Sequence, residues 1–473
     1  YQNPKPQEGT TESMGKTGSK QSNSRSVNVA SWNILADGLS LGEFMSNGGD
    51  ENVYWIHRRE RVVTCLSKLL QSCHVVVAQE NDHPTWILKQ LQASNPSVRM
   101  NKRRESGKSA RKIYVNRISK ALVEKGHYTQ EGGCDLIADD DQTNKNYEKL
   151  NAFLMENSSI KEQLMKEGLT CTTNAEESFE GYGDNGDNAI NPHDVYRAQE
   201  CLSVYYDSSK MEILSESQTN ESVYRIEFGF VKEPLTTFEV FPAHLKSGEA
   251  LKDERKRVQE LNPILEAAKQ AHNPIVIMDS NHSTQYEETI LAAELKDGQE
   301  EPFVSTIVAQ HGFLNTVQTS VGGRNENFKM RHAQGGQPKK FGSLMFDVID
   351  KILIRDNAQY EPLDLPDEVF QRYPNTENYH DILSQLRNNA VTRQALRQLC
   401  MDRKWGPNMQ QNDCPNDDAS LKEFGFDEDV IEKIQQEGGL KKILLAMYPN
   451  VDAPSDHPPV AATIYLGSGS AVK

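Results

Sequence analysis

The segment Pro274-Ile275-Val276-Ile277-Met278-Asp279-Ser280-Asn281 decides the fold class of this chain. Five successive apolar residues are followed by a carboxylate and, two residues later, by an amide. An uninterrupted apolar run of this length is typical of a strand that is buried on both faces. Polar residues at the ends of such strands gather at one edge of a sheet, where α/β proteins place their sites. The segment therefore predicts a buried strand that carries Asp279 and Asn281 at its end.

Several other apolar segments also end in, or lie beside, polar residues. These residues are Asn33 after 27–32, Glu80 after 74–79, His244 after 236–243, Asp350 within 346–354, and Asp456 and His457 before 460–466. Helical spacing of apolar residues over 55–71 and 84–91, and a charged helix over about 249–271, separate these strands. Because hairpin-like strand pairs also occur, the pattern predicts a layered α/β fold with mixed sheets.

The length and composition of the chain set its organisation. A chain of 473 residues suits one large domain with insertions or two to three smaller ones. Hydrophobic residues are 36% of the total, below the usual share for a globular chain, so some segments are expected to be surface loops or disordered. We predict a disordered leader over 1–26, a main domain over 27–467 with insertions at about 97–197 and 355–450, and a tail over 468–473.

Charge and cysteine content exclude several classes of protein. The net charge of −16 argues against tight, non-specific nucleic-acid binding, but it is compatible with a phosphate substrate, since a Mg²⁺ site needs acidic residues. Seven cysteines without a C-x-x-C pair argue against a zinc knuckle or a disulfide framework, so a reducing, cytoplasmic compartment is expected. The sequence contains no run of 18 apolar residues, so no membrane span is predicted. The sequence begins at Tyr1 and not at Met, and we therefore treat its N-terminus as processed or trimmed.

The polar residues beside the predicted strands suit one reaction in particular. Phosphoryl hydrolysis needs a hard cation held by carboxylates, a group that orients or deprotonates water, and donors for the phosphate oxygens. Glu, Asp, Asn and His supply all of these without a covalent nucleophile. Each residue alone is more often a turn or cap residue, so the prediction rests on their joint occurrence in this order.

The sequence around these residues resembles the endonuclease/exonuclease/phosphatase superfamily, which has the deoxyribonuclease-I-like fold. The matching motifs are Trp32-Asn33-Ile34-Leu35-Ala36-Asp37, Gln79-Glu80, His244-Leu245-Lys246-Ser247, Met278-Asp279-Ser280-Asn281, Ile349-Asp350-Lys351-Ile352-Leu353 and Ser455-Asp456-His457-Pro458. The resemblance covers about half of the chain, near 27–96, 198–354 and 450–467. It implies a four-layer α/β/β/α sandwich of two mixed β-sheets flanked by helices, with two large insertions.

The resemblance also implies a cofactor and part of the catalytic machinery. The cofactor is Mg²⁺, with Mn²⁺ as an alternative. Glu80 is a metal ligand, and Asp456 lies in or near the same metal shell. Asp279 orients or deprotonates the attacking water, and Asn281 positions phosphate or water. Asn33 contacts the cluster of metal and phosphate.

Three further residues gain roles from the same resemblance. His457 donates to the scissile phosphate, and Asp350 orients it through the other ring nitrogen, which fixes the tautomer. His244 supports the phosphate from the opposite side. Every metal and catalytic position of the superfamily that can be mapped carries a matching residue. This argues against a function of a different class, that of a catalytically silent binding scaffold.

Part of the sequence resembles one branch of the superfamily, the deadenylase, nocturnin and Angel enzymes. Trp55 with Arg58 and Arg59, the stretch 79–83, and His244-Leu245-Lys246 carry this resemblance. It implies Mg²⁺-dependent hydrolysis by a 3′–5′ exoribonuclease or a nucleotide phosphatase, with RNA or a phosphorylated nucleotide as the substrate. Lys246 stands where that branch has a lysine facing the substrate phosphate.

Three departures from the motifs concern the substrate. Met278 replaces a glycine, Ser280 replaces an apolar residue, and Lys351 replaces a tyrosine. The stretches 350–353 and 455–460 also resemble inositol polyphosphate and phosphoinositide phosphatases. The Pro-x-Trp-Cys and Asn-Tyr-Arg motifs of that branch are missing, so this function ranks second.

Two segments outside the motifs are expected to reach the substrate. The stretch 330–340 is basic, and we predict that Arg331 within it binds substrate. The second insertion lies between Asp350 and Asp456, two predicted site residues, so its ends must lie near the site. We therefore predict that it forms a wall or lid over the substrate cleft.

Overall fold

The computed structural model describes fifteen segments of the chain. These are residues 25–35, 55–81, 83–104, 122, 125–127, 143–166, 201–219, 223–248, 250–282, 302–317, 327–331, 343–370, 376–401, 414–446 and 453–467. The predicted leader up to residue 24, the predicted tail and most of the first predicted insertion lie outside them.

Two six-stranded sheets form the centre of the molecule. The first has the order β13 (Gln359–Pro362), β14 (Val460–Tyr465), β1 (Ser26–Asn33), β2 (Val75–Asn81), β4 (Cys201–Asp207) and β3 (Val98–Arg104). The second has the order β5 (Met211–Thr219), β6 (Val223–Phe230), β7 (Glu233–His244), β8 (Pro274–Asp279), β12 (Asp350–Arg355) and β9 (Phe313–Asn315). Strands β1 and β2 are parallel, as are β7 and β8, and the other neighbours are antiparallel. Both sheets are therefore mixed.

The central strands are buried on both faces, which explains their uninterrupted apolar runs. In β8, Ile275 and Ile277 lie in the apolar core between the two sheets, whereas Val276 and Met278 face the helices outside the second sheet. All four side chains are fully buried. Because successive residues of a strand point to opposite faces, a strand between two apolar layers needs an apolar residue at every position.

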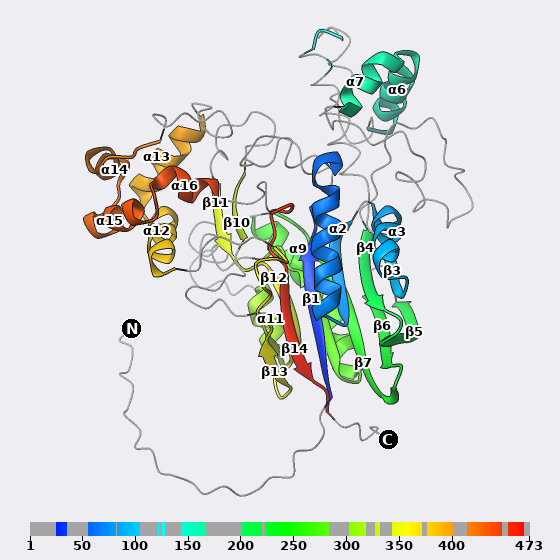
Figure 1. Cartoon of the computed structure of the whole chain (residues 1–473). Helices are drawn as coiled ribbons and strands as arrows, with labels where there is room; N and C mark the ends of the chain where they lie inside the picture. The colour runs from blue at the N-terminus through cyan, green and yellow to red at the C-terminus, as the bar shows by residue number, and fades with distance from the viewer. Residues whose placement is uncertain are drawn as a thin grey trace, which may run out of the picture.

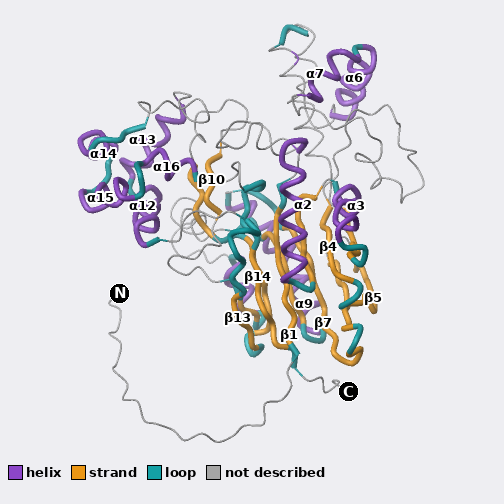
Figure 2. Tube along the Cα trace, viewed as in Figure 1, coloured by secondary structure: helices purple, strands orange, loops and turns teal. Residues whose placement is uncertain are grey.

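Helices cover the outer face of each sheet. Helices α2 (Trp55–Ser72) and α3 (Pro84–Ser94) pack on the first sheet, and α9 (Leu251–Gln270) and α11 (Val304–Gln310) pack on the second. Figures 1 and 2 show α2 in front of the strands, beside β1. The result is the predicted four-layer α/β/β/α sandwich. None of the described helices is long and apolar enough to cross a membrane.

Two strands lie inside segments that were predicted as insertions. Strand β3 falls within 97–197 and pairs with β4, and β13 falls within 355–450 and pairs with β14. Both are edge strands, and β3 carries Arg99, Lys102 and Arg103. Charged residues are common on edge strands, so a search for apolar periodicity does not detect such strands.

The single strand pattern predicted over 346–354 is two strands. Strand β11 (Ser343–Asp347) pairs with β10 (Asn327–Arg331) in a separate two-stranded sheet, whereas β12 begins at Asp350 and pairs with β8. Between them, the carbonyl of Ile349 accepts hydrogen bonds from Ser280 N and Ser280 Oγ. Asp350 therefore begins a strand, and does not lie within one.

The helices of the two insertions complete the described fold. They are α6 (Thr143–Glu156) and α7 (Ser158–Lys166) from the first insertion, and α12 (Glu377–Asn388), α13 (Ala390–Met401), α14 (Asp418–Phe424), α15 (Glu428–Gln436) and α16 (Leu440–Leu445) from the second. Thr376 and Asp417 cap the starts of α12 and α14 by accepting from backbone N–H groups three residues on. The buried apolar residues of the second group of helices belong to the same cluster as those of α2, α3 and the first sheet, and α12 contacts β11. Figure 1 shows it toward the end of the sheets at which β14 begins.

Candidate active site

Strand register brings the predicted site residues to one end of both sheets. In the second sheet, Asp279 pairs with His244 on β7 and with Asp350 on β12. In the first sheet, Asn33 pairs with the residue before Glu80. Strand β14, which follows His457, pairs with β1 near Asn33. The sandwich therefore gathers residues that are more than 400 positions apart in the sequence.

The amide of Asn33 connects the two sheets. Its Nδ2 donates to Glu80 Oε1 and to Asp279 Oδ2, each at 2.9 Å. Its Oδ1 accepts from Leu35 N at 2.9 Å, which fixes the orientation of the amide. His244 Nε2 lies 3.7 Å from the same two carboxylate oxygens. These contacts put a carboxylate from each sheet within reach of one small ligand.

Asp279 is held as a carboxylate although it is fully buried. Burial alone would raise its pKa, but the neighbouring His457 and His244, the Asn33 amide and the backbone N–H of Asn281 outweigh burial and lower the pKa below its usual value. Both carboxylate oxygens are engaged, since Oδ1 accepts from Asn281 N at 2.8 Å. The side chain is therefore ionised and fixed in orientation at neutral pH.

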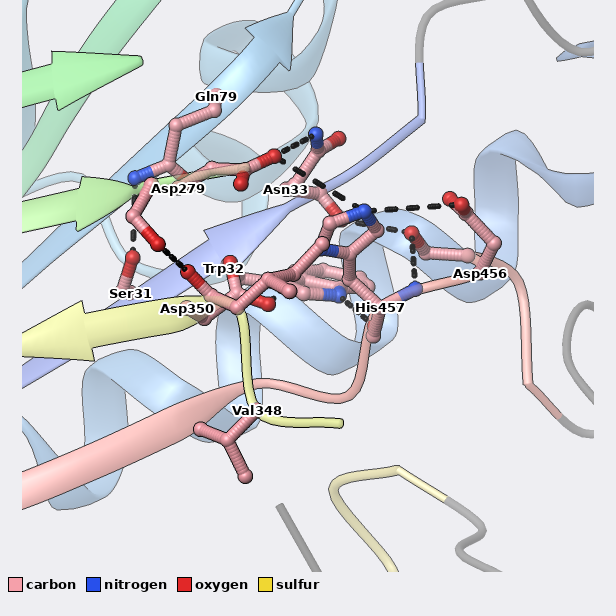
Figure 3. A network of polar contacts seen from close by, with 12 residues as sticks. Ser31, Trp32, Asn33, Gln79, Asp279, Val348, Asp350, Asp456 and His457 are labelled. Atoms are coloured by element: carbon pink, nitrogen blue, oxygen red, sulfur yellow. Dashed lines mark hydrogen bonds and ion pairs between the residues drawn. The ribbon is translucent and has the colours of Figure 1, made fainter. Parts of the chain in front are cut away.

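His457 and Asp350 form a buried pair beside Asp279 (Figure 3). The distance from His457 Nδ1 to Asp350 Oδ2 is 2.8 Å. Because a carboxylate only accepts hydrogen bonds, the proton lies on Nδ1. Nε2 then faces the site, 3.6 Å from Asp456 Oδ2 and 3.9 Å from Asp279 Oδ2. The backbone carbonyl of His457 accepts from Trp32 Nε1 at 2.8 Å, which holds the backbone of the pair in place.

Backbone strain is concentrated at the same place. Four non-glycine residues of the described segments have positive φ, and three of them are Leu35 (63°), Glu80 (53°) and Asn281 (47°). Left-handed backbone at such residues costs of order 1–3 kcal/mol and is found most often at functional sites. The fourth residue, Asn273 (45°), lies at the other end of β8.

The donor set fits a divalent cation. One atom each from Glu80, His244 and Asp279 lies within 4.8 Å of the others, and the same holds for Asp279, Asp350 and His457. Carboxylate oxygens are the ligands that Mg²⁺ and Mn²⁺ prefer, so Glu80 is well placed as a ligand. Asp456 lies on the His457 side of the site, and its membership of the same metal shell stays a prediction.

The two predicted substrate-binding residues stay predictions. Lys246 follows His244 by two residues and is exposed; its backbone N–H donates to Glu260 Oε2 at 2.8 Å. Arg331 is the last residue of β10, and its side chain lies outside the described part of the structure.

Two residues of the quoted motifs have structural roles that the sequence did not assign. Ser455 Oγ donates to the carbonyl of Asn33 at 2.6 Å and accepts from His457 N at 3.2 Å. Trp32 holds the carbonyl of His457, as described above. Their position inside the motifs was the only signal available for them.

A second buried polar network supports the loops behind the site. The carboxylate of Glu254 accepts from Arg257 Nε at 2.6 Å and from Val304 N at 2.8 Å, and it lies 3.0 Å from His282 Nδ1. Burial raises the pKa of Glu254, but His282, Arg257 and the Val304 N–H outweigh it and lower the pKa to about 2. Arg257 Nη1 also donates to the carbonyls of Lys246 and Gly248. No local sequence pattern predicts this network, because its members come from separate segments.

Comparison with known proteins returns matches among solved structures only. The chain is similar to ANGEL2, described as a 2′,3′-cyclic phosphatase, in complex with adenosine-2′,3′-vanadate (10% identity, 94% of this chain and 96% of that chain, TM-score 0.43). It is similar to the human Nocturnin catalytic domain with bound sulfate (12%, 93% and 95%, TM-score 0.38) and to an endonuclease/exonuclease/phosphatase family protein from Bacteroides thetaiotaomicron (12%, 72% and 85%, TM-score 0.33). No family model and no curated protein matches the chain. At these identities, the roles of individual residues rest on the geometry of this chain.

Proposed function

We propose that this chain is a metal-dependent phosphoesterase of the endonuclease/exonuclease/phosphatase superfamily. The observation that carries the proposal is the meeting of Asn33 and Glu80 from one sheet with His244 and Asp279 from the other, beside the His457–Asp350 pair. This set of buried and half-buried carboxylates, an amide and two imidazoles supplies every group that phosphate-ester hydrolysis needs.

Glu80 is the proposed ligand of Mg²⁺, with Asp456 in or near the same shell. When bound, the cation supplies a positive charge that offsets the negative charge developing on the phosphate oxygens. The amide of Asn33 positions the carboxylate of Glu80 for this role, because Nδ2 donates to Oε1 at 2.9 Å.

Asp279 is the proposed group that orients the attacking water. Its lowered pKa keeps it ionised, so it accepts a hydrogen bond from water well but removes a proton from it weakly. Orientation of water is therefore its better-supported role, and deprotonation the weaker one. Asn281 holds the second carboxylate oxygen and so fixes the direction of the first.

His457 is the proposed donor to the scissile phosphate. With its proton on Nδ1 directed at Asp350, a second proton on Nε2 points into the site and can be donated to a phosphate oxygen. Asp350 stabilises this doubly protonated ring by its charge, as a buried carboxylate does beside an imidazolium. His244 would support the phosphate from the side of Glu80.

The proposed substrate is RNA or a phosphorylated nucleotide, hydrolysed by a 3′–5′ exoribonuclease or nucleotide phosphatase activity. The support is the likeness of the motifs at 55–59, 79–83 and 244–246 to the deadenylase and nocturnin branch, together with the exposed Lys246 beyond His244. A net charge of −16 disfavours a protein that coats long duplexes, and favours recognition of a chain end or a small ester.

The test is release of phosphate or nucleotide from a panel of esters with Mg²⁺ and then with EDTA. The panel is poly(A) RNA, mixed-sequence RNA, single-stranded DNA, NADPH and an inositol polyphosphate. The variant is Asp279→Asn. Its matched control is Asp207→Asn, because Asp207 is also a buried aspartate that accepts several hydrogen bonds. Asp207 lies away from the site, since it follows Tyr206, which pairs with Val75 at the opposite end of β2 from Glu80.

Stepwise shortening of RNA, or phosphate release from NADPH, that is lost with EDTA and in Asp279→Asn but kept in Asp207→Asn would support the proposal. Turnover of the inositol polyphosphate alone would keep the mechanism and overturn the substrate class. Equal turnover with EDTA and with Mg²⁺, or by Asp279→Asn and the parent chain, would overturn the mechanism.

A further inference from the structure

Arg58 lies on α2, and the proposed mechanism gives it no role. Its side chain is fully buried, one of the largest in the described structure to be so. Nη1 donates to the carbonyl of Ile34 at 2.5 Å and to that of Pro454 at 3.3 Å, and Nη2 donates to the carbonyl of Leu35. A buried guanidinium that bonds three backbone carbonyls holds the chain in a specific path.

The three carbonyls belong to two segments that carry site residues. Ile34 and Leu35 follow Asn33 directly, and Pro454 precedes Ser455-Asp456-His457. The segments are about 420 residues apart in the sequence, and one planar group binds both. The hydrogen bond from Ser455 Oγ to the carbonyl of Asn33 runs between the same two segments.

Leu35 connects this contact to the side chain of Asn33. Its backbone has φ of 63°, which is left-handed and unfavourable for leucine. In this conformation Leu35 N donates to Asn33 Oδ1, so that Asn33 Nδ2 faces Glu80 and Asp279. If the segment relaxed to ordinary backbone, the amide would lose the bond that orients it.

We propose that Arg58 is a positioning residue of the active site: by holding the carbonyls of Leu35 and Pro454, it keeps the Asn33 amide and the Asp456-His457 segment in their working geometry. This inference rests on the proposed function. It assigns to α2, a helix that packs on the first sheet, an effect on the two segments of that sheet that carry Asn33 and Asp456-His457. Because Arg58 acts through Asn33 and Asp456, its loss weakens metal binding and slows the chemical step more than it weakens substrate binding.

The test compares Arg58→Ala and Arg58→Lys with Arg355→Ala. Lysine keeps the charge but has a single donor nitrogen, which cannot reproduce the fixed spacing of the guanidinium. Arg355 is the matched control, because its Nη2 donates to the carbonyls of Lys269 and Ala271, at 2.9 and 2.8 Å. It stands at the far end of β12 from Asp350, about 16 Å away along the strand.

Four quantities are measured for each folded variant: the melting temperature, the Mn²⁺ affinity in the absence of substrate, and kcat and KM on the panel member that the parent chain hydrolyses. Arg58→Lys is expected to lose about 10- to 100-fold in kcat and in Mn²⁺ affinity, with KM within about twofold. Arg355→Ala is expected to lower the melting temperature with both activity and Mn²⁺ affinity unchanged. Should Arg58→Ala not fold, Arg58→Lys decides the question.

A folded Arg58→Lys with the kcat and Mn²⁺ affinity of the parent would overturn the inference. An equal loss in Arg355→Ala would overturn it too, because the effect would then be one of general stability. Failure of the parent chain to hydrolyse any panel member would count against the proposed function alone, since the Mn²⁺ titration still decides the role of Arg58.

Discussion

Replacing Asp350 with asparagine should remove most of the activity and leave the fold intact. The two side chains have nearly the same shape, and the change removes the negative charge of the group that accepts from His457 Nδ1, through Oδ2 at 2.8 Å. Asparagine still offers an acceptor oxygen but carries no charge, and because Asp350 is fully buried and His457 is 3% exposed, solvent cannot offset the lost charge. A hydrogen bond to a charged group contributes about 1.5–3 kcal/mol. If the whole of this is lost from the transition state, kcat falls about 10- to 150-fold.

The assay is initial-rate hydrolysis at saturating Mg²⁺, over a range of substrate concentrations. Because Asp350 acts on the donor to the phosphate, kcat should fall while KM changes little. Asp207→Asn serves again as the control, because it also removes a buried carboxylate but from the opposite end of the first sheet. A folded Asp350→Asn variant whose kcat is within threefold of the parent would refute the role given to this pair.

Three other predictions test separate parts of the structure. Glu80→Gln should weaken Mn²⁺ binding by about 100-fold, as seen by calorimetry, with the melting temperature without metal little changed. Glu254 has a folded pKa of about 2 against a usual 4.5, so its carboxylate stabilises the fold by about 3 kcal/mol above pH 4.5, and this is lost as the pH falls toward 2. In urea unfolding, Glu254→Gln should therefore have a lower free energy of unfolding than the parent at pH 7, and this difference should narrow below pH 4.5. A difference that stays constant with pH would contradict the lowered pKa of Glu254. Gly425→Val should destabilise the α12–α16 helices by at least about 1 kcal/mol in thermal unfolding, because Gly425 has φ of 102° and an added Cβ would lie 2.8 Å from Val391 Cγ1.

The sequence was informative wherever a strand is buried on both faces. Uninterrupted apolar runs predict β2 and β8, an alternating pattern predicts β1, and the residues at the ends of these strands are Asn33, Glu80 and Asp279. This works because double burial demands an apolar side chain at each position, and because the strand ends of an α/β sheet share one edge. The four layers then followed from the resemblance to a known fold.

The sequence was silent where a residue acts through backbone atoms or at the margin of a sheet. Arg58 binds three carbonyls, and carbonyls have no sequence signature. In the described part of the structure strand β3 pairs on one side, with β4, and it carries arginines and a lysine, so apolar periodicity places it in the first predicted insertion. The pairing of Glu254 with His282 needs the fold to bring α9 beside the loop after β8.

The placement of Asn33 explains why such a site needs a two-sheet sandwich. Glu80 and Asp279 are two carboxylates whose charges repel, and each is supplied by a different sheet. The Asn33 amide donates one hydrogen bond to each carboxylate, and so offsets part of that repulsion without adding a charge. Its orientation is set by the backbone of Leu35, and that backbone is held by Arg58 on the helix outside the first sheet. Each layer from α2 to the second sheet thus contributes to the position of one amide, and the site forms only when those layers have packed.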